Sequence, residues 1–302
     1  MSLQRNSVRD GRRSETAFRL LLELVGLGVT VLLAAIFLSL LLASRPALVH
    51  NGLAFLTGTT WDPVADVYGA LPFLAGTLLT SGIALAIAMV LGLAVSILLG
   101  EYLTRGPFAT VLRSLVELLA GIPSVVYGFV GLAFLVPVVR SVQMALRLPP
   151  FGVSILTASL LLSIMILPYA ASIGREVIAL VPGDLREAAL SLGATRSETV
   201  RRVTLPYAMG GILGGMLLAL GRALGETMAV TMLIGNTSAL TLNLLAPGNT
   251  MASVIANEFT EAVGETYLAS LVEIGVLLFL TSTALNLGGR IVIKRMAREV
   301  GQ

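Results

Sequence analysis

The chain has 302 residues, of which 56% are hydrophobic and only 12% are charged, whereas soluble domains carry about 25% charged residues. Its 17 acidic and 20 basic side chains are too few to cover a soluble protein of this length, so the composition excludes a soluble domain and an intrinsically disordered chain. With no cysteine and a single histidine, His50, we expect no disulfide, no metal site and no bound cofactor. The net charge of +3 is too small to indicate nucleic acid binding.

Six apolar stretches are long enough to cross a bilayer core, which takes roughly 20 helical residues. The stretches are residues 20–42, 74–99, 115–138, 153–173, 207–234 and 267–287. The first exceeds the apolar region of about 7–15 residues in a cleaved signal peptide, so we expect it to stay as an anchor. The sequence therefore predicts an all-α integral membrane protein with six transmembrane helices.

Basic residues are unequally divided between the two sides of these spans. With a cytoplasmic N-terminus, 16 of the 20 basic residues fall on the inner side, while the outer loops hold only Arg45, Arg140 and Arg147. This asymmetry predicts that both termini are cytoplasmic. No repeat or long linker divides the chain, so we expect one membrane domain over residues 20–290, between cytoplasmic basic tails at 1–19 and 291–302.

The inner loop between the fourth and fifth spans, residues 182–206, has consistent helix signals. Asp184 precedes Glu187 by three positions, the spacing of a capping box, and Gly193 is suited to the left-handed residue that ends a helix. These signals predict a short helix that ends at a glycine bend.

A second short helix is predicted directly after that bend. Thr195 and Glu198 repeat the capping-box spacing, and Pro206 suits the first turn of the fifth span. Periodicity alone leaves two interpretations open, an ordinary cytoplasmic loop or a pair of helices that docks into another protein.

The loop also resembles the EAA loop of ABC importer permeases, in which a pair of coupling helices sits on the ATPase subunit. The resemblance rests on Glu187-Ala188-Ala189, on Gly193 four positions later and on Leu205-Pro206. It implies that the residues contacting an ATPase are Asp184, Glu187, Ala188, Ala189, Gly193, Ala194, Thr195, Glu198 and Pro206.

The chain lacks the lysine motif of a nucleotide-binding P-loop. That loop requires Gly-Lys followed by Ser or Thr, so that the lysine reaches the phosphates, and the only lysine, Lys294, lies between Ile293 and Arg295. Any nucleotide hydrolysis must therefore be done by another chain. Together with the resemblance to importer permeases, this implies a transport subunit that is not itself an enzyme, with ATP bound and hydrolysed by a partner chain.

Ionisable residues inside the spans are costly unless they are paired or face water. The five are Glu23, Glu117, Arg222, Glu226 and Glu273. Glu117 follows Arg113 by four positions, so a local ion pair is expected there. Arg222 lies about 22 Å along the fifth span at 1.5 Å per residue, with Glu226 one turn further on the same face.

Two interpretations of Arg222 and Glu226 stay open from the residues alone. The pair is either a structural lock between helices, or part of a path in which the arginine binds an oxyanion. Gly214, Gly221 and Gly225 in the same span are expected to pack closely against another helix.

The surrounding sequence resembles the C-type permease subunit of bacterial phosphate-specific (Pst) ABC importers, over roughly residues 60–295. The resemblance rests on residues 218–230 (LALGRALGETMAV), 232–236 (MLIGN) and 117–128 (ELLAGIPSVVYG). It implies a type I importer permease in the bacterial inner membrane. The implied partners are a second permease, a dimer of ATPase subunits and an extracytoplasmic phosphate-binding protein.

The resemblance matches Arg222 and Glu226 to the charged pair associated with phosphate passage. A helix break at Pro123 is expected to line the same path, because a proline frees a backbone carbonyl. We therefore assign to the substrate path Arg222, Glu226, Thr227, Ser124 and Tyr127. Alternatives are a permease for sulfate, molybdate or phosphonate, an ATP-independent channel or secondary transporter, and a subunit that signals external phosphate.

Overall fold

A computed structural model describes the backbone of residues 2–300, with the side chains of residue 15 and of residues 18–295. Among these residues, six helices are long and apolar enough to cross a membrane, as the sequence predicts. They are Phe18–Ala43, Leu71–Tyr102, Ser124–Ala145, Ile155–Ala179, Arg196–Leu224 and Glu265–Arg295. Arg5, Arg9, Arg12, Arg13 and Arg298, which contribute to the predicted charge asymmetry, have side chains outside the described part.

Most of the described chain is helical, and its N-terminal half contains seven α-helices and one hairpin. The α-helices are α1 (Ser2–Ala43), α2 (Arg45–Asn51), α3 (Ala54–Thr57), α4 (Leu71–Ile97), α5 (Pro107–Gly121), α6 (Ser124–Val130) and α7 (Val136–Ala145). A π-helical turn extends α4 over Leu98–Tyr102, and another, Gly131–Leu135, joins α6 to α7. The antiparallel strands β1 (Trp61–Asp62) and β2 (Val67–Tyr68) form the hairpin between α3 and α4.

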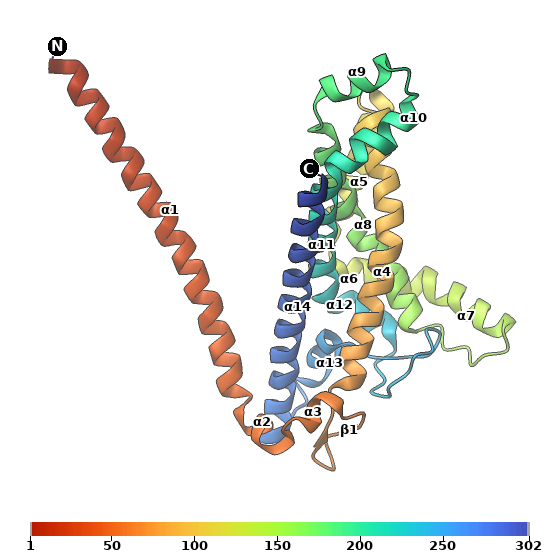
Figure 1. Ribbon diagram of the computed structural model, residues 1–302. Helices are drawn as coiled ribbons and strands as arrows, with labels where there is room; N and C mark the ends of the chain where they lie inside the picture. The colour runs from red at the N-terminus through yellow and green to blue at the C-terminus, as the bar shows by residue number, and fades with distance from the viewer. Residues whose placement is uncertain (1, 301–302) are drawn as a thin grey trace.

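The C-terminal half continues with α8 (Ile155–Ala179), α9 (Gly183–Ser191), α10 (Arg196–Thr199), α11 (Leu205–Leu224), α12 (Met228–Ile234), α13 (Met251–Glu258) and α14 (Glu265–Val300). A π-helical turn, Val200–Thr204, joins α10 to α11. The start of α1, the end of α14, and α9 and α10 all lie toward the same end of the molecule (Figure 1).

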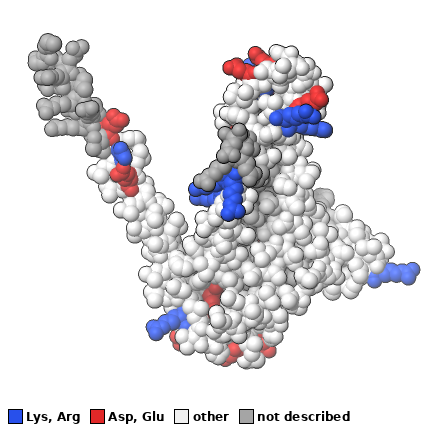
Figure 2. Space-filling view, viewed as in Figure 1, with Lys and Arg blue, Asp and Glu red and all other residues white. Residues whose placement is uncertain are grey.

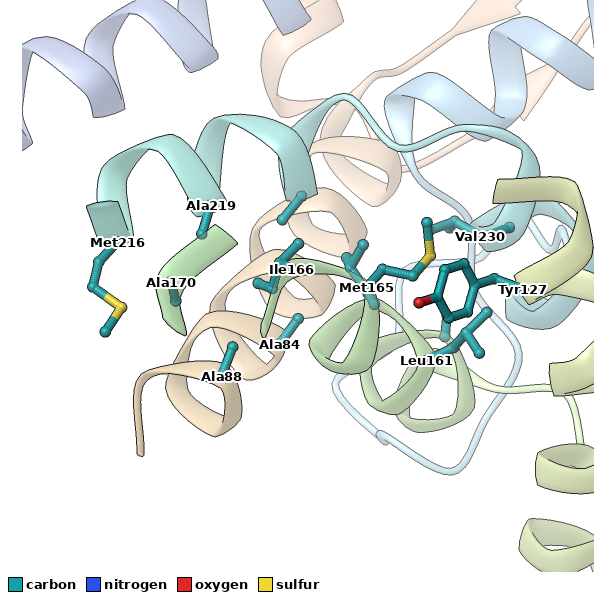
Figure 3. Packing of buried hydrophobic residues seen from close by; sticks show 14 of the residues in the cluster. Ala84, Ala88, Tyr127, Leu161, Met165, Ile166, Ala170, Met216, Ala219 and Val230 are labelled. Atoms are coloured by element: carbon teal, nitrogen blue, oxygen red, sulfur yellow. The ribbon is translucent and has the colours of Figure 1, made fainter. Parts of the chain in front are cut away.

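Helices α4, α8 and α11 form the centre of the bundle, and small side chains line their contacts. Ala84 and Ala88 of α4, Ala170 of α8 and Ala219 of α11 are buried together, and Figure 3 shows their methyl groups between the helices. Ser96 Oγ of α4 donates a hydrogen bond of 3.1 Å to the backbone oxygen of Ala171 in α8. Small residues let these backbones approach closely, which is how helices associate in a bilayer.

Two helices project away from this bundle. Helix α1 contacts α14 toward its C-terminal end, where the rings of Phe37 and Phe279 lie 5.0 Å apart, and diverges from it over the rest of its length, while α7 points outward on the other side (Figure 1). None of the residues in the most apolar stretch of Phe18–Ala43 is buried within the chain. The apolar surface of α1 is therefore left for lipid or for another subunit.

An aromatic cluster fixes the hairpin at the end of the bundle opposite α9. Trp61 Nε1 and the Tyr267 hydroxyl both donate to Glu258 Oε2, at 2.8 and 2.7 Å. The ring of Trp61 lies edge-on against Tyr68, with centroids 5.0 Å apart. Burial, followed by the hydrogen bond to Asp66, raises the pKa of the Tyr68 phenol to about 12, so it stays a neutral donor.

Gly76 of α4 packs against the backbone of the loop before α13. A Cβ at Gly76 would overlap the backbone oxygen of Asn249, whereas one at Gly82 of the same helix would meet nothing within 4 Å. We expect Gly76→Ala to destabilise the protein by about 1–3 kcal/mol through overpacking, and Gly82→Ala to be neutral or stabilising. Thermal unfolding of the two purified variants tests this, and equal effects would contradict the packing described.

Candidate functional sites in the bundle and on its inner loop

Arg222 and Glu226 form an ion pair at the end of α11. Arg222 Nη2 lies 3.1 Å from Glu226 Oε2, and the side chains are 41% and 3% exposed, respectively. The carboxylate is therefore buried while the guanidinium still reaches open space. Glu226 occupies one side of the guanidinium, and the remaining N–H groups of the arginine fork are available to a further acceptor.

The prediction of a continuous fifth span over residues 207–234 is wrong, because the helix breaks beside this pair. Helix α11 ends at Leu224, and α12 begins only at Met228. Glu226 Oε1 accepts a hydrogen bond of 3.4 Å from the backbone nitrogen of Ala229, so the glutamate also supports the start of α12. Thr227, half-buried in the break, donates through its hydroxyl to the Gly225 oxygen at 3.3 Å.

A second break interrupts the third span at Pro123. The predicted span over residues 115–138 is divided there, because α5 ends at Gly121 and both Ile122 and Pro123 are extended. The Tyr127 hydroxyl donates to the Leu119 oxygen at 2.8 Å. Leu119 is four residues before Pro123, so its carbonyl is the one that the proline leaves without a helical partner. Tyr127 therefore stabilises the break.

The five residues assigned to the substrate path occupy two interrupted helices that pack against each other. Gly128 and Gly131 of the third span lie against Met232 and Leu233 of α12. The structure thus brings the segments after the two breaks together, but the ring of Tyr127 points into the core beside Leu161 and Met165 (Figure 3). Ser124 is half-buried at the start of α6.

The three glycines predicted to pack between helices differ in their surroundings. A Cβ at Gly221 would lie 3.8 Å from Asn286 of α14, whereas one at Gly214 would meet nothing within 4 Å in the part of the chain described. At Gly225 the near atom belongs to α11 itself. Gly211 and Gly215 instead pack closely against α8. Packing through Gly214 stays a prediction for a neighbouring subunit.

Helix α9 carries the Glu187-Ala188-Ala189 motif on the inner loop. The prediction that Asp184 caps this helix is wrong, because the helix begins at Gly183 after Pro182 and no side chain caps it. Asp184 lies in the first turn, where a negative charge is favourable to the helix dipole. No residue of α9 is buried, so Glu187 and Ala188 are exposed and Ala189 is half-buried.

The predicted glycine bend after α9 is confirmed. Gly193 has a φ of +88°, and Ala194 N donates to the Ala189 oxygen at 3.1 Å. This 6→1 hydrogen bond is typical of a helix that ends at a left-handed glycine. The bend directs the chain back toward the membrane bundle.

The capping box of Thr195 and Glu198 is also confirmed, with both reciprocal hydrogen bonds present. The second helix is not separate, however. It continues through the π-helical turn Val200–Thr204 into α11, so Pro206 lies within a continuous helical segment. The wider turn accommodates a proline that lacks an N–H donor. The loop therefore consists of one short helix and an inner extension of the fifth span.

The remaining charges within or beside the spans have partners that the sequence did not predict. Glu117 Oε1 lies 3.8 Å from Arg175 Nη2 of α8, so the pairing expected with Arg113 is not formed. The buried Glu273 accepts from Asn51 Nδ2 at 3.3 Å. Glu101 pairs with Arg186 of the inner loop. The sequence did not single out Glu101 as a functional residue, although a lone acidic residue at the inner end of a long span could have indicated it.

Solved structures of ABC transporters contain chains with a similar fold. A bacterial alginate ABC transporter in complex with an alginate-bound periplasmic protein matches with a TM-score of 0.63 and 15% identity, covering 91% of this chain and 94% of that one. The MetNI methionine ABC transporter matches with a TM-score of 0.57 and 18% identity, over 74% of this chain and 93% of that one. The fold is that of a type I ABC importer permease.

Sequence comparison defines the family. The model described as "Binding-protein-dependent transport system inner membrane component" matches residues 92–298. Proteins named "Phosphate transport system permease protein PstC" are 41% identical in Mesorhizobium japonicum, over 90% of this chain and 88% of that protein, and 41% identical in Haemophilus influenzae, over 95% and 96%. The chain belongs to the binding-protein-dependent transport system inner membrane components and is a permease subunit in the membrane.

Proposed function

We propose that this chain is a permease subunit of an ATP-driven importer of inorganic phosphate. It forms the path for the anion together with a second permease, and a separate ATPase drives the cycle. The observation that carries the proposal is the guanidinium of Arg222, 41% exposed at a helix break and held by a buried carboxylate. The 41% identity to proteins named as phosphate transport system permeases supports phosphate as the anion.

The arrangement at the break suits a transient anion site. An arginine fork binds the oxygens of a tetrahedral anion through paired N–H donors. Glu226 holds the guanidinium of Arg222 on one side and partly neutralises its positive charge. The anion therefore meets N–H donors that are already oriented. Thr227, in the same break, provides a hydroxyl, and Ser124 provides another at the break of the third span.

Each end of the molecule is proposed to contact a different partner. The exposed helix α9 and the Thr195 capping box dock on a dimer of ATPase subunits, which bind and hydrolyse ATP, so this chain needs no cofactor. Basic side chains gather near α10 and the last turns of α14, while acidic ones lie at both ends of the molecule, near α9 and α10 and near the hairpin (Figure 2). The basic residues support a cytoplasmic position for α9 and both termini, because Lys and Arg favour the cytoplasmic side while acidic residues contribute little. The hairpin end then faces an extracytoplasmic phosphate-binding protein.

Competition between anions in a reconstituted complex tests the substrate. We expect ATP-dependent uptake of labelled phosphate into vesicles when the phosphate-loaded binding protein is present, and its inhibition by excess phosphate but not by sulfate, molybdate or phosphonate. Equal inhibition by these anions would favour another oxyanion importer. Uptake that continues without the ATPase subunits would instead indicate a channel or secondary transporter.

A further inference from the structure

Both arms of the inner loop contact the inner end of α4, at Glu101 and Tyr102. From α9, Arg186 Nη2 lies 3.3 Å from Glu101 Oε2. From α10, Arg196 Nη2 donates to the backbone oxygen of Glu101 at 2.5 Å, and its guanidinium stands 4.7 Å above the Tyr102 ring. Two segments separated by the Gly193 bend therefore converge on two adjacent residues of another helix.

The carboxylate of Glu101 depends on Arg186. Its side chain is only 8% exposed, and its Oε2 atom has no hydrogen-bond partner in the part of the chain described. A buried carboxylate needs a neighbouring positive charge, and the guanidinium supplies it. Arg186 Nη2 also donates to the Ile178 oxygen at 2.6 Å, near the end of α8. A displacement of α9 therefore pulls directly on α4.

Helix α4 connects this contact to the opposite end of the molecule. It runs from beside α10 to the region of α3 and α13 (Figure 1). At its outer end, Thr77 Oγ1 accepts a hydrogen bond of 2.9 Å from the Met251 nitrogen at the start of α13, and Gly76 packs on Asn249. Between the two ends, α4 packs along α8 and α11. The inner five residues, Leu98–Tyr102, form a π-helical turn, a feature often found at functional positions.

We propose that Glu101 and Tyr102 are positioning residues that transmit movement of the inner loop to α4, and through α4 to the outer loop at α13. The inference rests on the proposed function, because it takes the ATPase as the source of the movement. The pair does not contact the anion. Its role is to keep α9, α10 and α4 moving as one body when the ATPase subunits close.

The test uses the purified complex of both permeases and the ATPase dimer, reconstituted in vesicles. ATPase activity is measured with and without phosphate-loaded binding protein, together with uptake of labelled phosphate. For Glu101→Gln we expect the stimulation by loaded binding protein to fall at least about 5-fold, the lower end of typical coupling effects, while basal ATPase activity and co-purification of the ATPase are retained. Glu176→Gln is the matched control, since Glu176 is 67% exposed at the inner end of α8 and pairs only with Arg175 among described residues.

Tyr102 provides a second test that leaves the buried charge intact. Tyr102→Leu removes the ring beneath Arg196 and is expected to lower the stimulation of ATPase activity by loaded binding protein. Tyr102→Phe keeps the ring and is expected to keep the full stimulation. If Glu101→Gln prevents assembly of the complex, the comparison of Tyr102→Leu with Tyr102→Phe tests the inference in its place. Full stimulation in Glu101→Gln and in Tyr102→Leu overturns the inference while the proposed function stands. A wild-type complex that loaded binding protein does not stimulate contradicts the proposed function itself.

Discussion

Arg222→Gln is expected to reduce phosphate uptake by roughly 100-fold, which corresponds to losing a charged hydrogen-bonding partner worth up to about 3 kcal/mol. Glutamine is of similar size but has neither the charge nor the fork of the guanidinium. The variant also leaves the buried carboxylate of Glu226, which is 3% exposed, without its cation. Uptake of labelled phosphate by vesicles containing the assembled complex is the measurement, and co-purification of the ATPase confirms assembly.

A double variant separates anion binding from charge neutralisation. If Arg222 only compensates Glu226, then Arg222→Gln combined with Glu226→Gln removes both charges and restores uptake. If Arg222 binds the anion, the double variant stays inactive, and Arg222→Lys keeps partial uptake because it retains a positive charge. Recovery in the double variant would therefore leave the pair with a structural role only.

The six spans could be predicted from the sequence because hydrophobic length is a local property, but the two breaks could be predicted only in part. Pro123 indicated a break, since proline cannot continue the hydrogen-bond ladder. Its partner was not predictable, because the Leu119 carbonyl is satisfied by Tyr127 from the following helix. Around Gly225, the sequence is a run of mainly apolar and glycine residues without a proline, so it predicts one continuous helix and no break. Only the structure shows Glu226 turning to the nitrogen of Ala229.

The inner loop shows the same division between local and distant contacts. Thr195 and Glu198 are three residues apart, so their capping box follows from spacing. Asp184 was misplaced because Pro182 and Gly183 already begin the helix. The ion pair of Glu101 with Arg186 joins residues far apart in the chain. The position of Glu101 at the end of a span could single it out, but no local pattern identifies Arg186 as its partner. The features most important for transmission were thus the least accessible to sequence analysis.

Gly193→Val is expected to uncouple ATP hydrolysis from phosphate uptake. Gly193 has a φ of +88°, and a left-handed conformation costs an L-residue about 1–2 kcal/mol, more for a β-branched side chain. The bend between α9 and α10 then shifts, and the proposed docking surface no longer fits the ATPase. A loss of 1.4 kcal/mol corresponds to about 10-fold, so we expect uptake to fall about 10-fold while the ATPase subunits still hydrolyse ATP.

The control is Gly183→Val at the other end of α9, where the backbone has no positive φ and a Cβ meets nothing within 4 Å. Glu187→Trp adds a test independent of backbone strain. No residue of α9 is buried in the chain, so a bulky side chain at Glu187 disturbs nothing within this subunit, and any loss of uptake comes from a partner that covers the helix. Normal uptake in both Gly193→Val and Glu187→Trp, with the protein present in the membrane, would contradict docking through this loop.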